Sequence, residues 1–255
     1  MGLQKVTAGG KTVLVTGGRR VGSDLARTLA GLGWRVAMTY RDSREVIEAT
    51  VADVEAAGSE GLAIRADLTD PEQAEAAVAA TVARFGRIDA LVNMASIYRR
   101  TPLADLTPAD FDAMVAANLA APYHAAIAAA RAMLAQEPVD GIRGKLVFLG
   151  DWATERPYKG YLPYLAAKGG MTTLATALAV ELAPSIPVAT IQPAMIDPPP
   201  DLTEEDKRAV LEATPLRRFG SSGDVNRLIV YLLDETNFVT GVCYRVDGGR
   251  FLGNG

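Results

Sequence analysis

The sequence predicts a single α/β domain, built on a doubly wound, seven-stranded parallel sheet with helices on both faces. The 255 residues are 49% hydrophobic and 22% charged, which is the composition of a globular protein. Short apolar runs alternate with helical patterns from Lys11 onward, and no linker or low-complexity tract interrupts the series. The runs are apolar throughout, as expected for parallel strands that are buried on both faces.

The expected strands are the seven apolar runs, which are, in chain order, Thr12–Thr16, Arg35–Tyr40, Leu62–Arg65, Ala90–Met94, Lys145–Leu149, Val188–Gln192 and Val242–Val246. Two of the intervening helices have clear starts. Asp70-Pro71 places proline at a first helical position, and Thr107-Pro108-Ala109-Asp110 offers an N-cap, a proline and an acidic first turn. Right-handed βαβ crossovers then place ligands at the carboxyl ends of the strands, near the reversal of strand order.

Composition excludes several classes of function. A net charge of -4 argues against nucleic-acid binding. One cysteine, Cys243, and one histidine, His124, allow no internal disulfide and no His-rich metal site, so we expect no metal. The apolar stretches 120–134 and 165–184 contain charged residues, and the first ten residues lack the apolar core of a signal peptide. We therefore expect a cytoplasmic protein without a membrane span.

A glycine-rich turn, residues 16–23 (TGGRRVGS), follows the first strand and leads directly into a helical pattern. Glycines at such a turn let backbone N–H groups approach a pyrophosphate, and the start of the helix adds the positive end of its dipole. The alternative is a connection that serves only the path of the chain. The turn residues expected to contact a dinucleotide are Gly17, Arg19, Arg20, Val21 and Gly22.

The second strand ends in Tyr40-Arg41-Asp42-Ser43, where an acidic residue would bind the ribose hydroxyls of NAD. Arg41 stands in a position to read a 2′-phosphate, and Arg19, Arg20 and Ser43 could complete the cradle. This favours NADPH/NADP+. If the carboxylate of Asp42 faces the ribose instead, NAD would be used, and the simplest alternative is an Arg-Asp turn in solvent.

Tyr164 and Lys168 lie four residues apart at the start of a helical pattern and therefore share one helical face. A lysine ammonium beside a phenol lowers the pKa of the phenol and can relay a proton. A hydride-transfer enzyme needs such a proton at the atom next to the one that receives hydride. The pair therefore predicts an oxidoreductase.

In these motifs the chain, from Lys11 to Gly249, resembles the short-chain dehydrogenase/reductase family. The resemblance implies a Rossmann-type fold and a homotetramer. It also implies that Asn118 is the catalytic asparagine, which organises a water relay, and that residues 246–249 (VDGG) form the C-terminal motif. The further cofactor-binding residues that it implies, besides Tyr164 and Lys168, are Tyr40, Asp67, Leu68, Asn93, Ala95, Pro193 and Ile196.

One departure from the common family pattern bears on substrate. Asp151 stands where the family carries its catalytic serine, which resembles the pteridine reductase branch. Segments 20–22 (RVG), 93–98 (NMASIY) and 160–164 (GYLPY) resemble the same branch, whereas a shorter glycine turn, Met94 and Ala194 depart from it. The substrate-contacting residues that this resemblance implies are Ser96, Tyr98, Asp151, Tyr161 and Tyr164.

A carboxylate at Asp151 would keep Tyr164 protonated and would stabilise positive charge on a substrate. That suits reduction of a carbon–nitrogen double bond, whereas a ketone generates an oxyanion, for which Asp151 is a poor neighbour unless it is protonated. Alternatively, Asp151 is a helix N-cap or an ion-pair partner of Lys159 or Arg156. Tyr98 could equally be a core or lid aromatic.

The leading interpretation is an NADPH-dependent reductase of a pterin-like (dihydropterin or dihydrofolate-type) or other cyclic C=N substrate. The alternative is an NADPH-dependent carbonyl (ketone or 3-oxoacyl) reductase, and a third is an NADP(H) sensor without turnover. We expect one domain over residues 1–255. Within it, segment 198–215 is either a substrate lid or a solvated surface helix. Apolar helices predict self-association.

Overall fold

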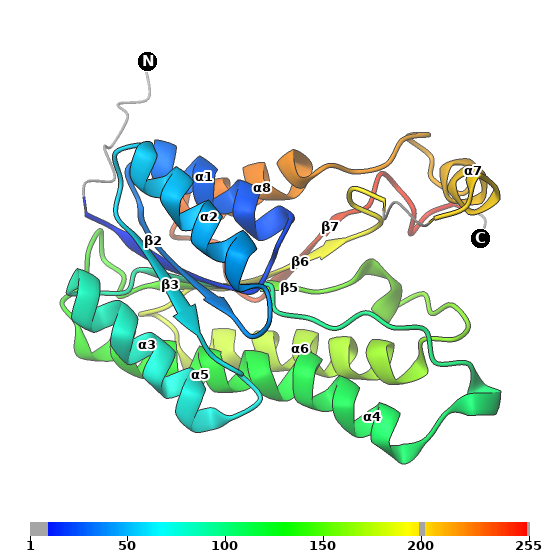
Figure 1. The fold of residues 1–255 in the computed structure, drawn as a ribbon, viewed down its shortest axis with the longest axis horizontal. Helices are drawn as coiled ribbons and strands as arrows, with labels where there is room; N and C mark the ends of the chain where they lie inside the picture. The colour runs from blue at the N-terminus through cyan, green and yellow to red at the C-terminus, as the bar shows by residue number, and fades with distance from the viewer. Residues whose placement is uncertain (1–9, 199–201, 254–255) are drawn as a thin grey trace.

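The computed structural model describes residues 10–198 and 202–253. They form a three-layer domain around one seven-stranded parallel sheet of order β3-β2-β1-β4-β5-β6-β7 (Figure 1). The strands are β1 (Thr12–Thr16), β2 (Arg35–Tyr40), β3 (Gly61–Arg65), β4 (Ala90–Asn93), β5 (Lys145–Leu149), β6 (Val188–Pro193) and β7 (Val242–Val246). The predicted fold class is confirmed, and β3, β4 and β6 differ from their predicted bounds by a single residue at one end.

Helices cover both faces of the sheet (Figure 1). One layer contains α1 (Val21–Gly31), α2 (Arg44–Ala56) and α8 (Ser222–Val230), and the other contains α3 (Pro71–Phe85), α4 (Pro108–Val115), α5 (Ala121–Ala135) and α6 (Leu162–Glu181). Each layer closes its own apolar core against the sheet. Helix α7 (Glu204–Glu212) lies apart from both layers, beyond one end of the sheet.

The predicted helix starts are confirmed by their caps. The Asp70 side chain accepts a hydrogen bond from the backbone N–H of Glu72, and Pro71 occupies the first turn of α3. Thr107 and Asp110 form a reciprocal capping box at the start of α4. These local signals fix where the helices begin and therefore which strand ends the connecting loops follow.

Helices α4 and α5 are joined without a break by a π-helical turn, η2 (Ala116–Ala120). The resulting segment, 108–135, is longer than the apolar stretch that the sequence predicts, and by length and composition alone it could cross a membrane. However, 56% of its most apolar window is buried inside the fold, as in a core helix of a soluble protein.

The strand order places β1 between β2 and β4, and the order along the chain reverses there. In doubly wound sheets ligands bind in the crevice at the carboxyl ends of the strands beside such a reversal. Thr16 at the end of β1 is in register with Thr39 of β2 and Asn93 of β4. The loops that follow these three residues therefore meet at one edge of the sheet, together with the loop after β5.

Candidate active site

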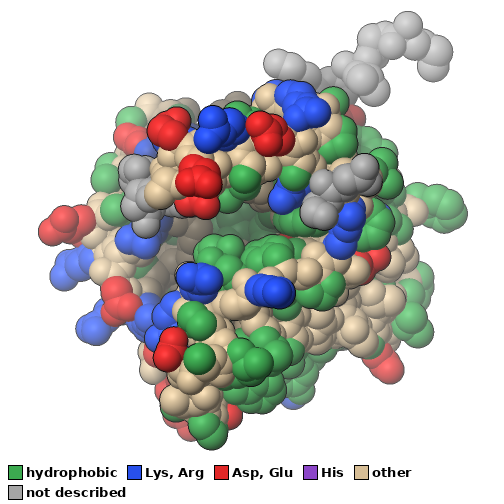
Figure 2. All heavy atoms as spheres, turned by 90° about the vertical axis from the view of Figure 1, so that its right-hand side faces the viewer, with side chains coloured by type: hydrophobic (Ala, Val, Ile, Leu, Met, Phe, Trp, Pro, Cys, Tyr) green, Lys and Arg blue, Asp and Glu red, His purple; other side chains and the backbone are tan. Residues whose placement is uncertain are grey.

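A cavity of about 2440 Å³ opens at the carboxyl ends of the strands. Seen from the side that carries α7, the molecule is hollowed there, and Lys and Arg side chains border the hollow (Figure 2). The predicted site residues that line the cavity are Gly17, Arg19, Arg20, Val21, Tyr40, Arg41, Ser43, Asp67, Leu68, Ala95, Ser96, Tyr98, Asp151, Tyr161, Tyr164, Lys168, Pro193 and Ile196. The lining does not include the predicted site residues Gly22, Asn93 and Asn118.

Asp151 and Tyr164 are in direct contact. The Tyr164 hydroxyl donates a hydrogen bond of 2.8 Å to Oδ2 of Asp151, and the backbone N–H of Ala153 donates one of 2.8 Å to Oδ1. Asp151 is therefore both a partner of Tyr164 and the N-cap of a short 3-10 helix, η3 (Trp152–Thr154). Among the described residues it forms no ion pair with Lys159 or Arg156, so the cap alternative holds and the ion-pair alternative is wrong.

Burial controls the protonation of both groups. Burial raises the pKa of Asp151, although the bonds from Ala153 and Tyr164 oppose the rise. Burial, followed by the charge of Asp151, raises the pKa of Tyr164 well above 10. Tyr164 is therefore a neutral phenol that can donate a proton, in line with the predicted effect of Asp151.

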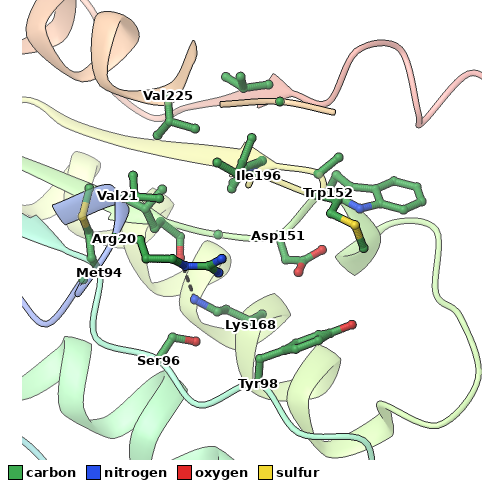
Figure 3. A pocket seen from close by; sticks show the side chains of 18 of the residues that line it. Arg20, Val21, Met94, Ser96, Tyr98, Asp151, Trp152, Lys168, Ile196 and Val225 are labelled. Atoms are coloured by element: carbon green, nitrogen blue, oxygen red, sulfur yellow. Dashed lines mark hydrogen bonds between the residues drawn. The ribbon is translucent and has the colours of Figure 1, made fainter. Parts of the chain in front are cut away.

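Lys168 lies on α6, close to Asp151 (Figure 3), and is almost fully buried. Its ammonium donates a hydrogen bond of 2.7 Å to the carbonyl of Leu149 rather than to Tyr164. Burial lowers the pKa of Lys168 to about 8, and the charge of Asp151 acts in the opposite direction. The expected lowering of the pKa of Tyr164 by Lys168 is not found, because burial and Asp151 raise this pKa.

Asn118 sits in the π-helical turn η2 and is fully buried. Its Oδ1 accepts hydrogen bonds of 2.6 Å from the Ser96 hydroxyl and 3.1 Å from the Ile97 N–H, and its Nδ2 donates one of 3.0 Å to the Ile97 carbonyl. The side chain thus fixes the loop after β4. The expected substrate contact, Ser96, already donates its hydroxyl to Asn118.

Four tyrosines gather beside Asp151. The Tyr98 ring stacks on Tyr161, with centroids 4.6 Å apart and planes at 14°, and meets Tyr164 edge-on at 5.0 Å. The Tyr98 hydroxyl lies 3.2 Å from that of Tyr158, and Tyr98 remains 56% exposed toward the cleft. Sequence reasoning missed Tyr158, although the three-residue spacing of Tyr158, Tyr161 and Tyr164 is a visible signal.

The glycine turn has the geometry of a phosphate cradle. Gly17 has φ +64°, and a Cβ there would lie 2.9 Å from the Ala95 Cα. A Cβ on Gly22 would lie 3.1 Å from the Gly17 carbonyl oxygen. The turn therefore needs glycine to bring the start of α1 close to the loop after β4. An exposed backbone cradle at a helix start fits the pyrophosphate of a nicotinamide dinucleotide.

The residues expected to read a 2′-phosphate are only partly assembled. Arg41 pairs through Nε with Asp42 at 2.8 Å, and both side chains are exposed. The Ser43 side chain makes no capping bond at the start of α2. Arg20 does not join them, because its guanidinium donates a hydrogen bond of 2.6 Å to the carbonyl of Asp197, which follows β6. This bond uses only Nη1 of Arg20, and the expectation that Arg20 completes the cradle stays a prediction.

The remaining cofactor-binding candidates lie at strand ends. Asp67 accepts hydrogen bonds from the N–H and hydroxyl of Thr69, which fixes the loop after β3. Asn93 accepts a 3.4 Å bond from the Thr16 hydroxyl, and its buried Nδ2 has no partner in the described part of the chain. Residues 10–198 and 202–253 contain no cluster of His, Cys, Asp or Glu arranged to hold a metal ion.

Comparison with known proteins decides the family. A family model described as enoyl-(acyl carrier protein) reductase matches residues 17–250. The 3-oxoacyl-[acyl-carrier-protein] reductase of Staphylococcus aureus is 32% identical over 247 residues, which cover 95% of this chain and 98% of that protein. A crystal structure of a dehydrogenase/reductase from Sinorhizobium meliloti has a TM-score of 0.88 and 35% identity, covering 96% of this chain and 97% of the other.

The chain belongs to the short-chain dehydrogenase/reductase family. It is an oxidoreductase, and the family uses a nicotinamide dinucleotide. Another similar relative is the L-rhamnose 1-dehydrogenase (NAD(P)(+)) of Sphingomonas, 32% identical over 250 residues, which cover 95% of this chain and 97% of that protein. These relatives favour the carbonyl alternative, and none of them supports the pteridine reductase branch.

Proposed function

We propose that this enzyme is an NADPH-dependent reductase of a carbonyl compound of the ketone or 3-oxoacyl type. The observation that carries the proposal is the buried contact between the Tyr164 hydroxyl and Asp151 at 2.8 Å, inside the cleft. Burial raises the pKa of Asp151, in the direction of the protonated acid. We propose that Asp151 is protonated when the substrate reacts. It is then a hydrogen-bond donor and does not repel a developing oxyanion.

Each residue of the site then has a defined task. Tyr164 donates its proton to the carbonyl oxygen as negative charge develops there, and Asp151 donates a hydrogen bond to the same oxygen. Lys168 holds positive charge near both groups. Asn118 positions the loop that carries Ser96. A bound nicotinamide dinucleotide would supply the hydride, held by the glycine turn and by the loops after β2 and β3.

The preference for NADPH over NADH rests on Arg41, Arg19 and Ser43, which line the cavity at its cofactor end. Arg41 uses Nε for Asp42, so its two terminal amino groups can still bind a phosphate. NADPH should bind at least about tenfold tighter than NADH. Arg41→Ala should weaken NADPH binding and leave NADH binding nearly unchanged, which fluorescence titration measures. Equal affinities in the wild type would refute the preference.

A second candidate, reduction of a dihydropterin or another cyclic imine, is supported by one observation. The stacked Tyr98–Tyr161 pair lies in the cavity beside Asp151, and aromatic faces suit a flat heterocycle. In this reaction Asp151 acts as a carboxylate that stabilises positive charge on the ring nitrogen.

Steady-state NADPH oxidation separates these candidates. We expect turnover with acetoacetyl-coenzyme A or ethyl acetoacetate and little with 7,8-dihydropterin. The reverse result would replace the carbonyl proposal by the imine candidate. Tyr164→Phe is the control for both, because loss of a general acid lowers the rate by about a hundredfold to ten-thousandfold while cofactor binding persists. Binding without turnover of any substrate would favour a sensor.

We further propose that segment 198–215 covers bound substrate. Residues 199–201 lie outside the described part of the chain, but Leu202, Asp206 and Val210 line the cavity. Val210→Asp should then raise KM for the carbonyl substrate and leave the NADPH affinity unchanged. We also propose a homotetramer and a cytoplasmic location, which the resemblance to the family supports. Light scattering tests the tetramer, and cell fractionation tests the location.

A further inference from the structure

Two arginines stand together at the substrate end of the cleft. Arg156 follows η3, Arg250 follows β7, and both line the cavity together with Trp152. The Arg250 guanidinium lies over the Trp152 ring, 5.5 Å from its centroid. Arg156 donates hydrogen bonds to the carbonyls of Phe251 and Gly253. The fold therefore brings the Arg250 guanidinium over the residue that follows Asp151, and the charge of Arg156 acts on Arg250.

No acidic side chain of the described residues neutralises this pair. None of the ion pairs includes Arg156 or Arg250. Each acid that lines the cavity is already engaged elsewhere. The engagements are Asp42 with Arg41, Asp67 with Thr69, Asp151 with Tyr164, Asp206 with Thr203, Asp224 with Arg218, and Asp247 with the backbone N–H groups of Gly249 and Phe251.

The lack of an acidic partner destabilises the charged form of Arg250. Its Nη1 is buried and has no hydrogen-bond partner among the described residues. Burial, followed by the charge of Arg156, lowers the pKa of Arg250. A buried donor without an acceptor and two like charges side by side both destabilise the folded state unless an anion relieves them.

We propose that Arg250 and Arg156 form a subsite for a carboxylate group of the substrate. The planar fork of a guanidinium matches the two oxygens of a carboxylate. The Trp152 ring, whose face attracts cations, holds the Arg250 guanidinium in place for this contact. The inference rests on the proposed carbonyl reductase activity and names its substrate class, an oxo acid. Because Arg156, Arg250 and Asp151 line the same cavity, the proposal places the carboxylate and the reacting carbonyl in one molecule.

Binding of malonate tests the subsite without requiring turnover. The protein is saturated with NADP+, which occupies the arginines of the cofactor end, and Trp fluorescence is followed during titration. The chain has two tryptophans, and Trp34 is fully buried before β2, so the change in signal is assigned to Trp152. A Trp152→Phe variant checks this assignment. We expect saturable malonate binding and none with the neutral analogue malonamide.

Matched variants decide the role of Arg250. Arg250→Met should weaken malonate binding at least about tenfold, and Arg250→Lys should weaken it less because the charge remains. Arg218→Met is the control, because Arg218 lines the same cavity but is already paired with Asp224 at 2.8 Å. Unchanged affinity in Arg250→Met, or an equal response to malonamide, would overturn the subsite. Thermal melting verifies that each variant is folded.

A kinetic comparison keeps this inference apart from the proposed function. Acetoacetate and ethyl acetoacetate carry the same reacting ketone, but only the first has a carboxylate. In the wild type we expect kcat/KM to be at least about tenfold higher for acetoacetate than for ethyl acetoacetate. In Arg250→Met the kcat/KM values of the two substrates should become similar. Equal rates on both substrates would refute the subsite and leave the reductase standing. Malonate binding without reduction of either would refute the reductase alone.

Discussion

Asp151 is the residue on which substrate chemistry depends, because its two carboxylate oxygens have different partners. One accepts the hydrogen bond of the Ala153 N–H and the other that of the Tyr164 hydroxyl. Serine at this position could be only a small neutral donor or acceptor. Aspartate only accepts hydrogen bonds when it is ionised, and it can also donate one when it is protonated. Burial raises the pKa of Asp151 and therefore moves this transition to higher pH.

The substitution Asp151→Ser separates the two candidate reactions. For a carbonyl substrate, serine replaces the neutral acid as a donor to the oxyanion, so kcat should stay within about tenfold of the wild-type value. For a cyclic imine, loss of the carboxylate should lower kcat by about tenfold or more. The measurement is kcat/KM on both substrate types, with a melting curve to exclude loss of the cap on η3. A large loss on ketones would contradict the role given to Asp151.

Lys168 gives the activity an alkaline limit. Its pKa is lowered to about 8, so the ammonium is charged below that pH and neutral above it. Loss of this charge next to Asp151 and Tyr164 makes the phenol a poorer proton donor, and kcat should therefore fall as the pH rises through about 8. The profile is recorded at saturating substrate and NADPH.

The variant Lys168→Arg provides the control for this limit, because a guanidinium stays charged throughout the range. The variant should lose activity overall, and any remaining activity should show no fall near pH 8. If its alkaline limb lay at the same pH as in the wild type, another group would be responsible.

At the scale of elements, short sequence motifs predict those site residues that directly follow a strand or begin a helix. Gly17 after β1, and Tyr164 with Lys168 on α6, could be predicted because neighbouring residues define their position. Contacts between distant segments could not be predicted. The hydrogen bond from Arg20 to Asp197 joins residues that are 177 apart in the sequence. Arg156 and Arg250 are also distant in the sequence, and they come close together only because β7 packs at the edge of the sheet.

The role of the glycine turn between β1 and α1 can be tested by substitution. Gly17→Ala places a Cβ 2.9 Å from the Ala95 Cα at a φ of +64°, which strains the turn and moves the start of α1. The affinity for NADPH should fall at least about tenfold. Gly31→Ala, at the end of the same helix, meets nothing within 4 Å and should be neutral or stabilise by up to about 1 kcal/mol. Calorimetric titration and urea unfolding measure the two effects.

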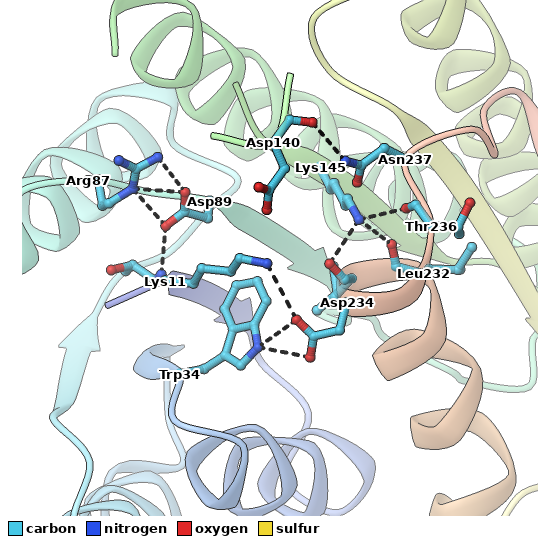
Figure 4. A network of polar contacts seen from close by, with 12 residues as sticks. Lys11, Trp34, Arg87, Asp89, Asp140, Lys145, Leu232, Asp234, Thr236 and Asn237 are labelled. Atoms are coloured by element: carbon cyan, nitrogen blue, oxygen red, sulfur yellow. Dashed lines mark hydrogen bonds and ion pairs between the residues drawn. The ribbon is translucent and has the colours of Figure 1, made fainter. Parts of the chain in front are cut away.

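At the scale of the whole molecule, the end of the sheet opposite the cleft is closed by a buried lysine. Lys145 at the start of β5 is 6% exposed, and its ammonium donates three hydrogen bonds, of 2.8, 2.8 and 2.7 Å, to carbonyls (Figure 4). The acceptors belong to the π-helical turn η4 (Tyr231–Glu235) and the loop after it, namely Leu232, Leu233 and Thr236. Nearby, Asp234 accepts a bond from the Trp34 indole.

This network ties the central sheet to the segment that follows α8. Its sequence signal is weak, because a lysine that begins a strand normally lies in solvent and only the packing of η4 buries it. Lys145→Met would fit the space but would leave three backbone carbonyls without a donor. We expect the free energy of unfolding to fall by about 2 kcal/mol or more at pH 7. Lys159→Met, at an exposed position, should change it by no more than about 0.5 kcal/mol.

The pH dependence of this effect has a definite sign. Burial lowers the pKa of Lys145 to about 8 in the folded state, from 10.5 in the unfolded chain. Between these values the unfolded chain binds more protons, so the lysine contributes more stability as the pH rises from about 8 to about 10. The difference in unfolding free energy between wild type and Lys145→Met should therefore widen over this range in urea titrations. A difference that narrows or stays constant would show that Lys145 keeps its proton in the folded protein.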